Sequence, residues 1–153
     1  MTNSIDIKAK APFPAGALSN FAQHPFTFDS IACASMEGLL QSFKVEDAAE
    51  QAEICALSGG EAQGRGRRHD WSQSGTLFWR GEPFDRLSDE YQELLDRAYD
   101  ALFAQSSKFR SALAATGEAR LTHALGSDDP TETILTAQEF CSRLELLRAR
   151  LKA

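Results

Sequence analysis

Apolar residues recur every three or four positions in several stretches of the chain, and this spacing predicts helices with one buried side. Such stripes run through residues 35–44, 88–105 and 136–151. Their members are Met36, Leu39, Leu40 and Phe43; then Tyr91, Leu94, Leu95, Ala98 and Leu102; and last Phe140, Leu144, Leu147 and Leu151.

Capping residues and glycines predict where the helices begin and end. Ser35 can cap the first helix, and Thr136 with Glu139 has the spacing of a capping box at the start of the last one. Glycines follow or end three shorter helices, which are predicted over residues 47–57, 107–117 and 118–126.

Strand patterns are confined to two short stretches. "FTFDSIAC" predicts a hairpin that turns at Asp29 and Ser30, and "TLFWRGEPF" predicts a strand and a turn. Residues 61–71 are rich in glycine and arginine and predict a loop. The fold class is therefore mainly α with a small β component, in a single domain over residues 1–153 whose residues 1–10 are allowed to be flexible.

Composition narrows the class of protein. The chain has 153 residues, of which 42% are hydrophobic and 25% charged, as in an ordinary globular domain. Its net charge of −6 disfavours a protein that holds duplex nucleic acid by broad neutralisation of phosphates. The sequence contains no apolar run of membrane-spanning length and no signal-peptide core. Cys33, Cys55 and Cys141 lack zinc spacing and are interpreted as reduced core residues, which favours a cytoplasmic protein.

One row of polar residues lies next to an apolar stripe. Glu37, Gln41 and Lys44 are four and three residues apart, so a helix places them on one side. A solvated face would explain this row, and so would the floor of a pocket. In a pocket, desolvation would lower the pKa of Lys44 and favour a nucleophilic amine, whereas attraction by Glu37 would raise that pKa. The sequence leaves the sign of this shift open.

Other residues have both a structural and a chemical interpretation. "GRGRRHDW" can bind an anion through Arg65, Arg67 and Arg68, with Trp71 stacking on a base, or it can be an exposed loop beside a core tryptophan. Trp79 is expected in the core. His123 is interpreted as a packing or capping residue, and Asp128 and Asp129 as turn residues. Hydrolase, zinc-protease, Walker and Rossmann motifs are missing from the sequence.

Several short motifs together resemble the NADAR superfamily, which is also called YbiA-like. They are "LSNF" at 18–21, "PF" at 25–26, "SMEGLLQSFK" at 35–44, "GR" before "DW" within 66–71, and "ALAATG" at 112–117. Their order and gaps agree with the family over roughly residues 12 to 126. The Ser-x-Glu-x-x-x-Gln-x-x-Lys helix after Ser-Asn-Phe is the most specific part.

The resemblance implies a compact YbiA-like domain, mainly α-helical, that cleaves an N-glycosidic bond in a phosphorylated ribose compound. Members are linked to early riboflavin-pathway intermediates or to ADP-ribosylated guanine. Glu37 and Lys44 match catalytic positions. Lys44 would capture the opened sugar as a Schiff base, while Glu37 would bind the ribose hydroxyls or position the attacking group. The matching substrate-binding positions are Asn20, Phe21, Gln41, Arg67 and Trp71.

The sequence departs from the family pattern at two places. Gly38 stands where the family usually has His, and "GSDDPTETILT" replaces a late Asp-x-x-Trp-Gly motif. A pocket wall is therefore expected to be missing or replaced.

The leading hypothesis is an N-glycosidase, an ADP-ribosyl-hydrolase-like enzyme without cofactor or metal. It would act on a small ribosyl phosphate or an ADP-ribosylated nucleotide, free or attached to nucleic acid. The alternatives are a non-catalytic module that binds ADP-ribose or NAD-like nucleotides, and a helical adaptor whose Glu37–Lys44 row faces solvent.

Overall fold

The protein is described by a computed structural model that covers residues 3–152. Its helices and strands follow the chain in the order β1 (Ser4–Asp6), α1 (Ala15–Leu18), β2 (Phe26–Phe28), β3 (Ile31–Cys33), α2 (Met36–Ser42), α3 (Ala48–Cys55), α4 (Gly59–Gly66), β4 (Thr76–Trp79), β5 (Glu82–Asp85), α5 (Asp89–Gln105), α6 (Ser107–Ala115), β6 (Arg120–Thr122) and α7 (Ala137–Arg150). The predicted fold class, mainly α with a small β component, is confirmed.

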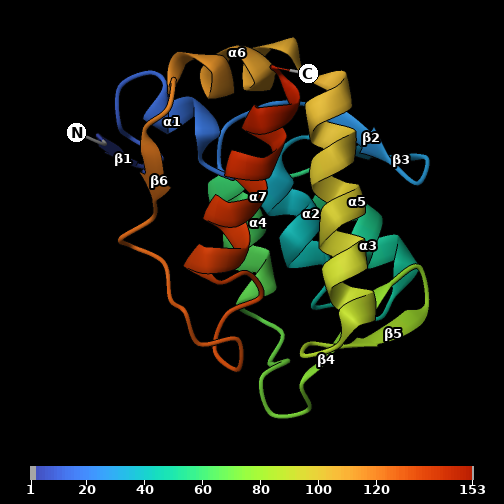
Figure 1. The fold of residues 1–153 in the computed structure, drawn as a ribbon. Helices are drawn as coiled ribbons and strands as arrows, with labels where there is room; N and C mark the ends of the chain where they lie inside the picture. Colours follow the sequence, from blue (N-terminus) through green and yellow to red (C-terminus); the bar gives the residue numbers. More distant parts are fainter. Residues whose placement is uncertain (1–2, 153) are drawn as a thin grey trace.

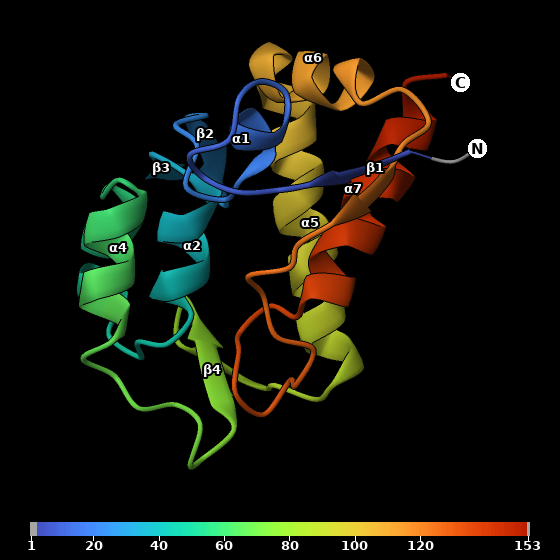
Figure 2. The same cartoon turned by 90° about the vertical axis from the view of Figure 1, so that its left-hand side faces the viewer.

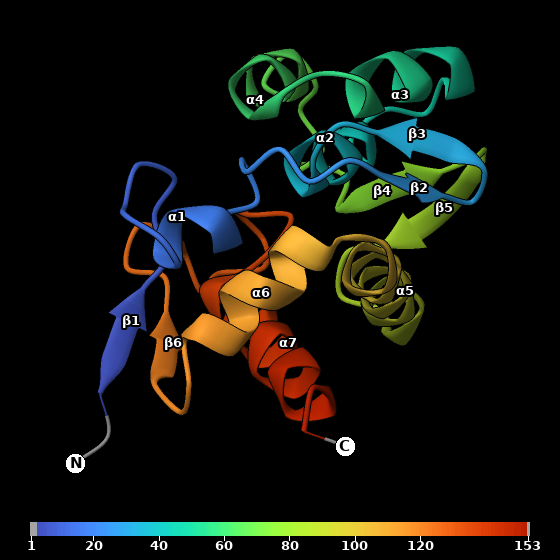
Figure 3. The same cartoon turned by 90° about the horizontal axis from the view of Figure 1, so that it is seen from above.

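Two groups of helices surround the core. The long helices α5 and α7 contact each other, and α6 lies across one end of the pair (Figure 1). Seen from above, α2, α3 and α4 form a second group with the hairpins β2–β3 and β4–β5 (Figure 3). Helix α2 lies between α4 and α5 (Figure 2). All seven of its residues are buried, so α2 is a central helix with no solvated face.

Local signals in the sequence account for the starts of α2 and α7. Ser35 Oγ accepts a hydrogen bond of 3.2 Å from the backbone N–H of Gly38, as the capping interpretation predicted. Thr136 and Glu139 form the full predicted capping box, because each side chain accepts from the other residue's backbone N–H. Gly117, just after α6, has a φ of 60°, a left-handed conformation that suits glycine.

The predicted hairpin is present, and the strand and turn predicted in "TLFWRGEPF" form a second hairpin, in which β4 pairs antiparallel with β5. Strands β2 and β3 pair antiparallel around Asp29 and Ser30, whose φ angles of 47° and 69° are those of the tight turn that matches strand twist. The side chain of Asp29 is tied to the second hairpin, because the indole Nε1 of Trp79 donates to its Oδ2 at 2.8 Å. Trp79 is 3% exposed and packs in the core, as predicted.

Two predictions of secondary structure were wrong. Residues 61–71 were expected to form a loop, but α4 extends to Gly66 and Arg67 caps its end. Tertiary packing stabilises this glycine-rich helix, since Ala62 and Gly66 are buried against its neighbours. Residues 118–126 were expected to be helical, but β6 forms there and pairs in parallel with β1.

The pairing of β1 with β6 was not predicted at all. Ser4 lies opposite Arg120 and Asp6 opposite Thr122, so the front of the chain is held in a two-stranded sheet. Residues 1 and 2, part of the segment that was allowed to be flexible, lie outside the described residues.

The three cysteines and the lengths of the helices can be compared with their interpretation from the sequence. Cys33, Cys55 and Cys141 are free and buried, in agreement with their interpretation as core residues. Among the residues described, no helix is both long and apolar enough to cross a bilayer.

Candidate active site

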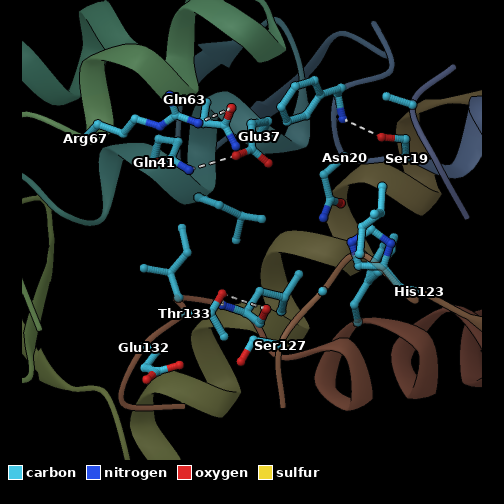
Figure 4. A pocket seen from close by; sticks show the side chains of 18 of the residues that line it. Ser19, Asn20, Glu37, Gln41, Gln63, Arg67, His123, Ser127, Glu132 and Thr133 are labelled. Carbon is cyan, nitrogen blue, oxygen red and sulfur yellow. Dashed lines mark hydrogen bonds between the residues drawn. The ribbon is translucent and has the colours of Figure 1, made fainter. Parts of the chain in front are cut away.

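A cavity of about 520 Å³ opens between α2 and α4 on one side and residues 123–135 on the other (Figure 4). We call residues 123–135 the far wall. The cavity brings together all seven predicted site residues, which are Asn20, Phe21, Glu37, Gln41, Lys44, Arg67 and Trp71. Their chemical roles stay predictions.

The polar row of Glu37, Gln41 and Lys44 faces this cavity. The helix ends at Ser42, earlier than predicted, so Lys44 lies in the turn that follows α2. Glu37 is 9% exposed and Gln41 is 5% exposed, so the alternative of a solvated face is wrong for these two residues. Gln41 Nε2 donates a hydrogen bond of 2.7 Å to Glu37 Oε1. The backbone N–H of Glu37 donates to the carbonyl of Asn20 at 2.9 Å, which joins the start of α2 to the "LSNF" segment. The carboxylate is thus held by its neighbours before any ligand binds.

The electrostatics of the row answer the question that the sequence left open. Burial lowers the pKa of the Lys44 amine below its usual range; Glu37 opposes this shift and the charge of Arg67 adds to it. Burial also raises the pKa of Glu37, although the Gln41 hydrogen bond, Lys44 and His123 act in the opposite direction. Desolvation therefore dominates at both groups. A lowered pKa increases the neutral fraction of the Lys44 amine, and the neutral form is the one that can act as a nucleophile.

Close contacts explain two glycines near the row. A Cβ atom on Gly66 would lie 1.8 Å from Gln41 Oε1, so only glycine lets α4 approach the row this closely. A Cβ on Gly38 would lie 3.0 Å from the carbonyl oxygens of Ile54 and Cys55. Position 38, where the family pattern has His, therefore faces the end of α3 and not the cavity.

Arg67 and Trp71 enter the cavity from the chain that follows α4. Arg67 is exposed at the end of that helix, and its guanidinium donates to Gln63 Oε1 at 3.2 Å. Trp71 is 7% exposed and belongs to the hydrophobic core while it also lines the cavity. Both interpretations of Trp71, core residue and pocket wall, are therefore compatible with its place.

Asn20 and Phe21 line the cavity opposite the far wall, together with α2 and α4. The hydroxyl of Tyr99 donates to Asn20 Oδ1 at 2.7 Å. This bond fixes the orientation of the amide, so that its NH₂ group points away from Tyr99. Phe21 packs against α4, where a Cβ on Gly59 would lie 2.7 Å from the ring. The sequence indicated both residues only through the resemblance.

The far wall contains most of "GSDDPTETILT", the segment at which the sequence departs from the family pattern. Figure 4 shows His123, Ser127, Glu132 and Thr133 on the side of the cavity away from Glu37 and Gln41. Sequence reasoning missed all four as site residues. The polar composition of "GSDDPTET" was a signal, yet nothing local in it indicates which side chains face a cavity.

Hydrogen bonds from distant elements hold the far wall in place. Buried Arg86 donates through Nε to the carbonyl of Thr133 at 2.9 Å and pairs with Glu139 at 2.7 Å. The backbone N–H of Ala137 donates to the carbonyl of Ser127 at 2.9 Å. Asp129 Oδ1 accepts from the backbone N–H of Thr131 at 2.9 Å, so its interpretation as a turn residue is confirmed.

His123 was expected on a short helix, but it follows strand β6. Its ring packs edge-on against Phe140 at 5.4 Å between centroids, in agreement with a packing residue, and it also lines the cavity. Within residues 3–152, no three His, Cys, Asp or Glu side chains are grouped so that they could hold a metal ion.

Comparisons with known proteins relate the sequence to a bacteriophage family. The family model of the bacteriophage protein GP30.3 matches residues 12–149. The chain is 42% identical over 148 residues to an uncharacterized 17.1 kDa protein in the Gp30-rIII intergenic region of Enterobacteria phage T4, covering 95% of this chain and 97% of that protein.

A solved structure extends the comparison. The NMR structure of the E. coli protein YbiA superposes with a TM-score of 0.65 and 20% identity, and the match covers 99% of this chain and 87% of that one. The YbiA-like fold that the resemblance to the NADAR superfamily predicted is thereby confirmed. The chain belongs to the bacteriophage protein GP30.3 family.

Proposed function

We propose that the protein is an N-glycoside hydrolase that cleaves the base–ribose or base–ADP-ribose bond of a phosphorylated ribosyl substrate. ADP-ribosylated guanine and a riboflavin-pathway intermediate are the two substrate types considered. The observation that carries this proposal is one cavity in which a buried carboxyl and an amine with a lowered pKa, Glu37 and Lys44, meet an exposed guanidinium and an indole.

The size and charge of the cavity support a nucleotide-like substrate. About 520 Å³ lies within the range of pockets that take small ligands and cofactors. Arg67 can pair with a phosphate through its planar guanidinium, and Trp71 offers a flat surface to a base. Asn20 and Gln41 supply amide groups that can hold sugar hydroxyls, while Phe21 closes the apolar side.

Glu37 and Lys44 carry the chemistry in this proposal. The Lys44 amine attacks C1 of the ribose, the C1–N bond breaks, and its electron pair leaves with the base, which takes up a proton from the amine. The nitrogen lone pair then forms the C1=N bond as the C1–O bond of the ring breaks. The ring oxygen keeps that electron pair and takes the second proton of the amine, which leaves an imine between Lys44 and C1. Glu37 binds the ribose hydroxyls and so places C1 against the amine. Water then hydrolyses the imine and frees the sugar.

A non-catalytic module that binds ADP-ribose or NAD-like nucleotides is the second candidate. The observation in its favour is the far wall, which differs from the family's late Asp-x-x-Trp-Gly segment. A binding module would need the same cavity and the same phosphate and base contacts. It would hold the ligand without breaking the C1–N bond.

The discriminating experiment is an incubation of pure protein with ADP-ribosylated guanine nucleotides and with ribosyl intermediates of the riboflavin pathway, read by mass spectrometry. In H₂¹⁸O, hydrolysis releases a free base and leaves ¹⁸O on the sugar product. The matched control is the double variant Glu37→Gln, Lys44→Met, whose side chains are close in size. Binding without release of base by the wild-type protein would contradict the enzyme and support the module.

We also propose that the protein acts in the cytoplasm, since its three cysteines are free thiols in the core. Substrates attached to nucleic acid remain compatible with a net charge of −6 only if contacts are local, as at Arg67 and Arg68.

A further inference from the structure

His123 is a titratable group of the cavity to which the proposed function gives no role. It follows β6 and begins the far wall, and its ring reaches the cavity from the side away from Glu37 (Figure 4). Its charge is near enough to Glu37 to lower the pKa of that carboxyl. Glu37 and His123, which are ionisable groups from different parts of the chain, thus line the same cavity.

The hydrogen bond of His123 defines which ring nitrogen carries the proton. Nδ1 lies 2.8 Å from the backbone carbonyl oxygen of Ile7, and a carbonyl can only accept, so Nδ1 is the donor. In the neutral ring, Nε2 then has a free lone pair. Ile7 is 0% exposed and does not line the cavity, so the Nδ1 edge faces the interior.

The other edge of the ring is accessible. Within residues 3–152, Nε2 of His123 has no hydrogen-bond partner. The buried side-chain atoms that lack a partner do not include Nε2, so this atom is exposed to water. The ring is held by Phe140 on its side and by Gly126 at its edge, where a Cβ atom would lie 2.6 Å from Cδ2. The structure therefore holds an imidazole in one tautomer, with its acceptor nitrogen free.

We propose that His123 is a third catalytic residue, the general base that activates the water for the second half of the reaction. This inference rests on the proposed function. Nε2 takes a proton from water, the hydroxyl bonds to C1 of the Lys44 imine, and the π electron pair moves to nitrogen. His123 returns this proton to the nitrogen, which gives a carbinolamine. Nε2 then takes the hydroxyl proton, the C=O bond forms as the C–N bond breaks, and this second proton passes to the departing Lys44 amine, so the sugar is released as an aldehyde. Protons and electrons balance without a further reactant.

The position of His123 suits this step better than that of Glu37. Glu37 lies on α2, which leads directly into Lys44, and its Oε1 already accepts the Gln41 amide. His123 comes from a different wall, so it can hold a water against the face of the imine that α2 does not cover. Histidine is also the side chain best suited to take and return a proton near neutral pH.

The variant His123→Asn tests the inference with little disturbance of packing. The Asn amide nitrogen occupies about the place of Nδ1, so it still donates to Ile7, but the acceptor at Nε2 is lost. We expect one stoichiometric burst of released base and then turnover reduced at least about 100-fold. Borohydride should trap more sugar adduct on Lys44 than in the wild-type protein, because the imine accumulates.

His24→Gln is the matched control. His24 Nε2 lies 2.7 Å from the carbonyl of Ala17, its side chain is buried, and it does not line the cavity. Glutamine can keep a donor at that position, so turnover should stay at the wild-type level. Thermal melting of both variants establishes that they fold.

Several outcomes would overturn the inference while the proposed function stands. One is wild-type turnover by a folded His123→Asn protein, and another is loss of the burst and of the adduct together.

A third readout needs no turnover. On addition of ADP-ribose, the side-chain ¹⁵N signal of His123 Nε2 should shift while that of His24 does not; binding without this shift overturns the role. A wild-type protein that releases no base overturns the proposed function, and the role of His123 with it.

Discussion

The helix α2 and the far wall place polar groups in the same cavity, but different forces hold them. Helix α2 spaces Glu37 and Gln41, Lys44 lies in the turn just after its end, and burial of all seven helix residues fixes the helix itself. The far wall has no regular structure between β6 and α7, and it is held by hydrogen bonds from Arg86 and from the start of α7. The comparison teaches that the residue spacing in a helix predicts which side chains share one side of a site. The side chains of an irregular segment are positioned by hydrogen bonds to distant residues, which the local sequence does not reveal.

The largest expected effect comes from Lys44→Arg, which tests the α2 side. Arginine keeps the positive charge but stays protonated in proteins, so it cannot form the imine. We expect the turnover number to fall at least about 10³-fold. Borohydride during turnover should attach a sugar adduct to Lys44 of the wild-type protein, located by mass mapping. Lys108→Arg, at an exposed position of α6, is the matched control. Retained activity without any adduct would leave Lys44 an electrostatic role only.

Arg86→Met tests the anchor of the far wall. The substitution leaves Glu139 without its partner at 2.7 Å and removes the donor to the Thr133 carbonyl. Breaking a buried pair on one side costs about 3–5 kcal/mol in the free energy of unfolding, which denaturant unfolding can measure. Arg97→Met, in an exposed pair with Asp29, should cost at most about 1 kcal/mol. Equal losses in the two variants would show that the far wall does not depend on Arg86.

Gly66→Ala tests how closely α4 must approach the polar row. The added methyl would lie 1.8 Å from Gln41 Oε1, so α4 must shift or Gln41 must leave Glu37. We expect a loss of about 1–3 kcal/mol in the free energy of unfolding, with a higher Michaelis constant. Gly64→Ala on the same helix meets no atom within 4 Å and should be stabilising by up to about 1 kcal/mol. An equal loss in Gly64→Ala would contradict the role of the Gln41 contact.

The smallest expected effect is a pH dependence of stability at Glu37. Burial raises the pKa of this carboxyl in the folded protein, so it keeps a proton at pH values where the unfolded chain, with an ordinary value of 4.5, has lost it. The folded state then binds more protons, and stability falls as the pH rises through the window above 4.5. Glu37→Gln removes this loss.

Urea unfolding from about pH 4 to pH 8 checks the sign. The free energy of unfolding of Glu37→Gln, relative to wild type, should rise with pH and then level off. Glu93→Gln, an exposed position on α5, controls for the loss of one charge. A difference that falls with pH would contradict the raised pKa.

Prediction from the sequence succeeded where the signal lies within one turn or one helix. The capping residues Ser35 and Thr136, the turn at Asp29 and the stripe of α5 all depend on neighbours in the chain. The spacing of Glu37 and Lys44 belongs to the same class. Whether that row faced water depended on α4 and the rest of the core, and only the resemblance favoured a pocket.

The remaining features depend on contacts between distant residues. Helix α4 forms from a segment whose glycines disfavour a helix, because Gly66 fits against Gln41. Strand β6 is defined by β1, more than a hundred residues before it. The far wall likewise takes its shape from Arg86, so its cavity-facing residues had no signature of their own.

The pairing of β1 with β6 gives the front of the chain a part in the site. Asp6 Oδ1 accepts from the Ala124 backbone at 2.8 Å, and the Ile7 carbonyl accepts from His123 at 2.8 Å. These bonds lie at the first residues of the far wall. For protein engineering, residues 4–8 are therefore part of the site. Their removal would release His123 and take buried Ile7 out of the hydrophobic core.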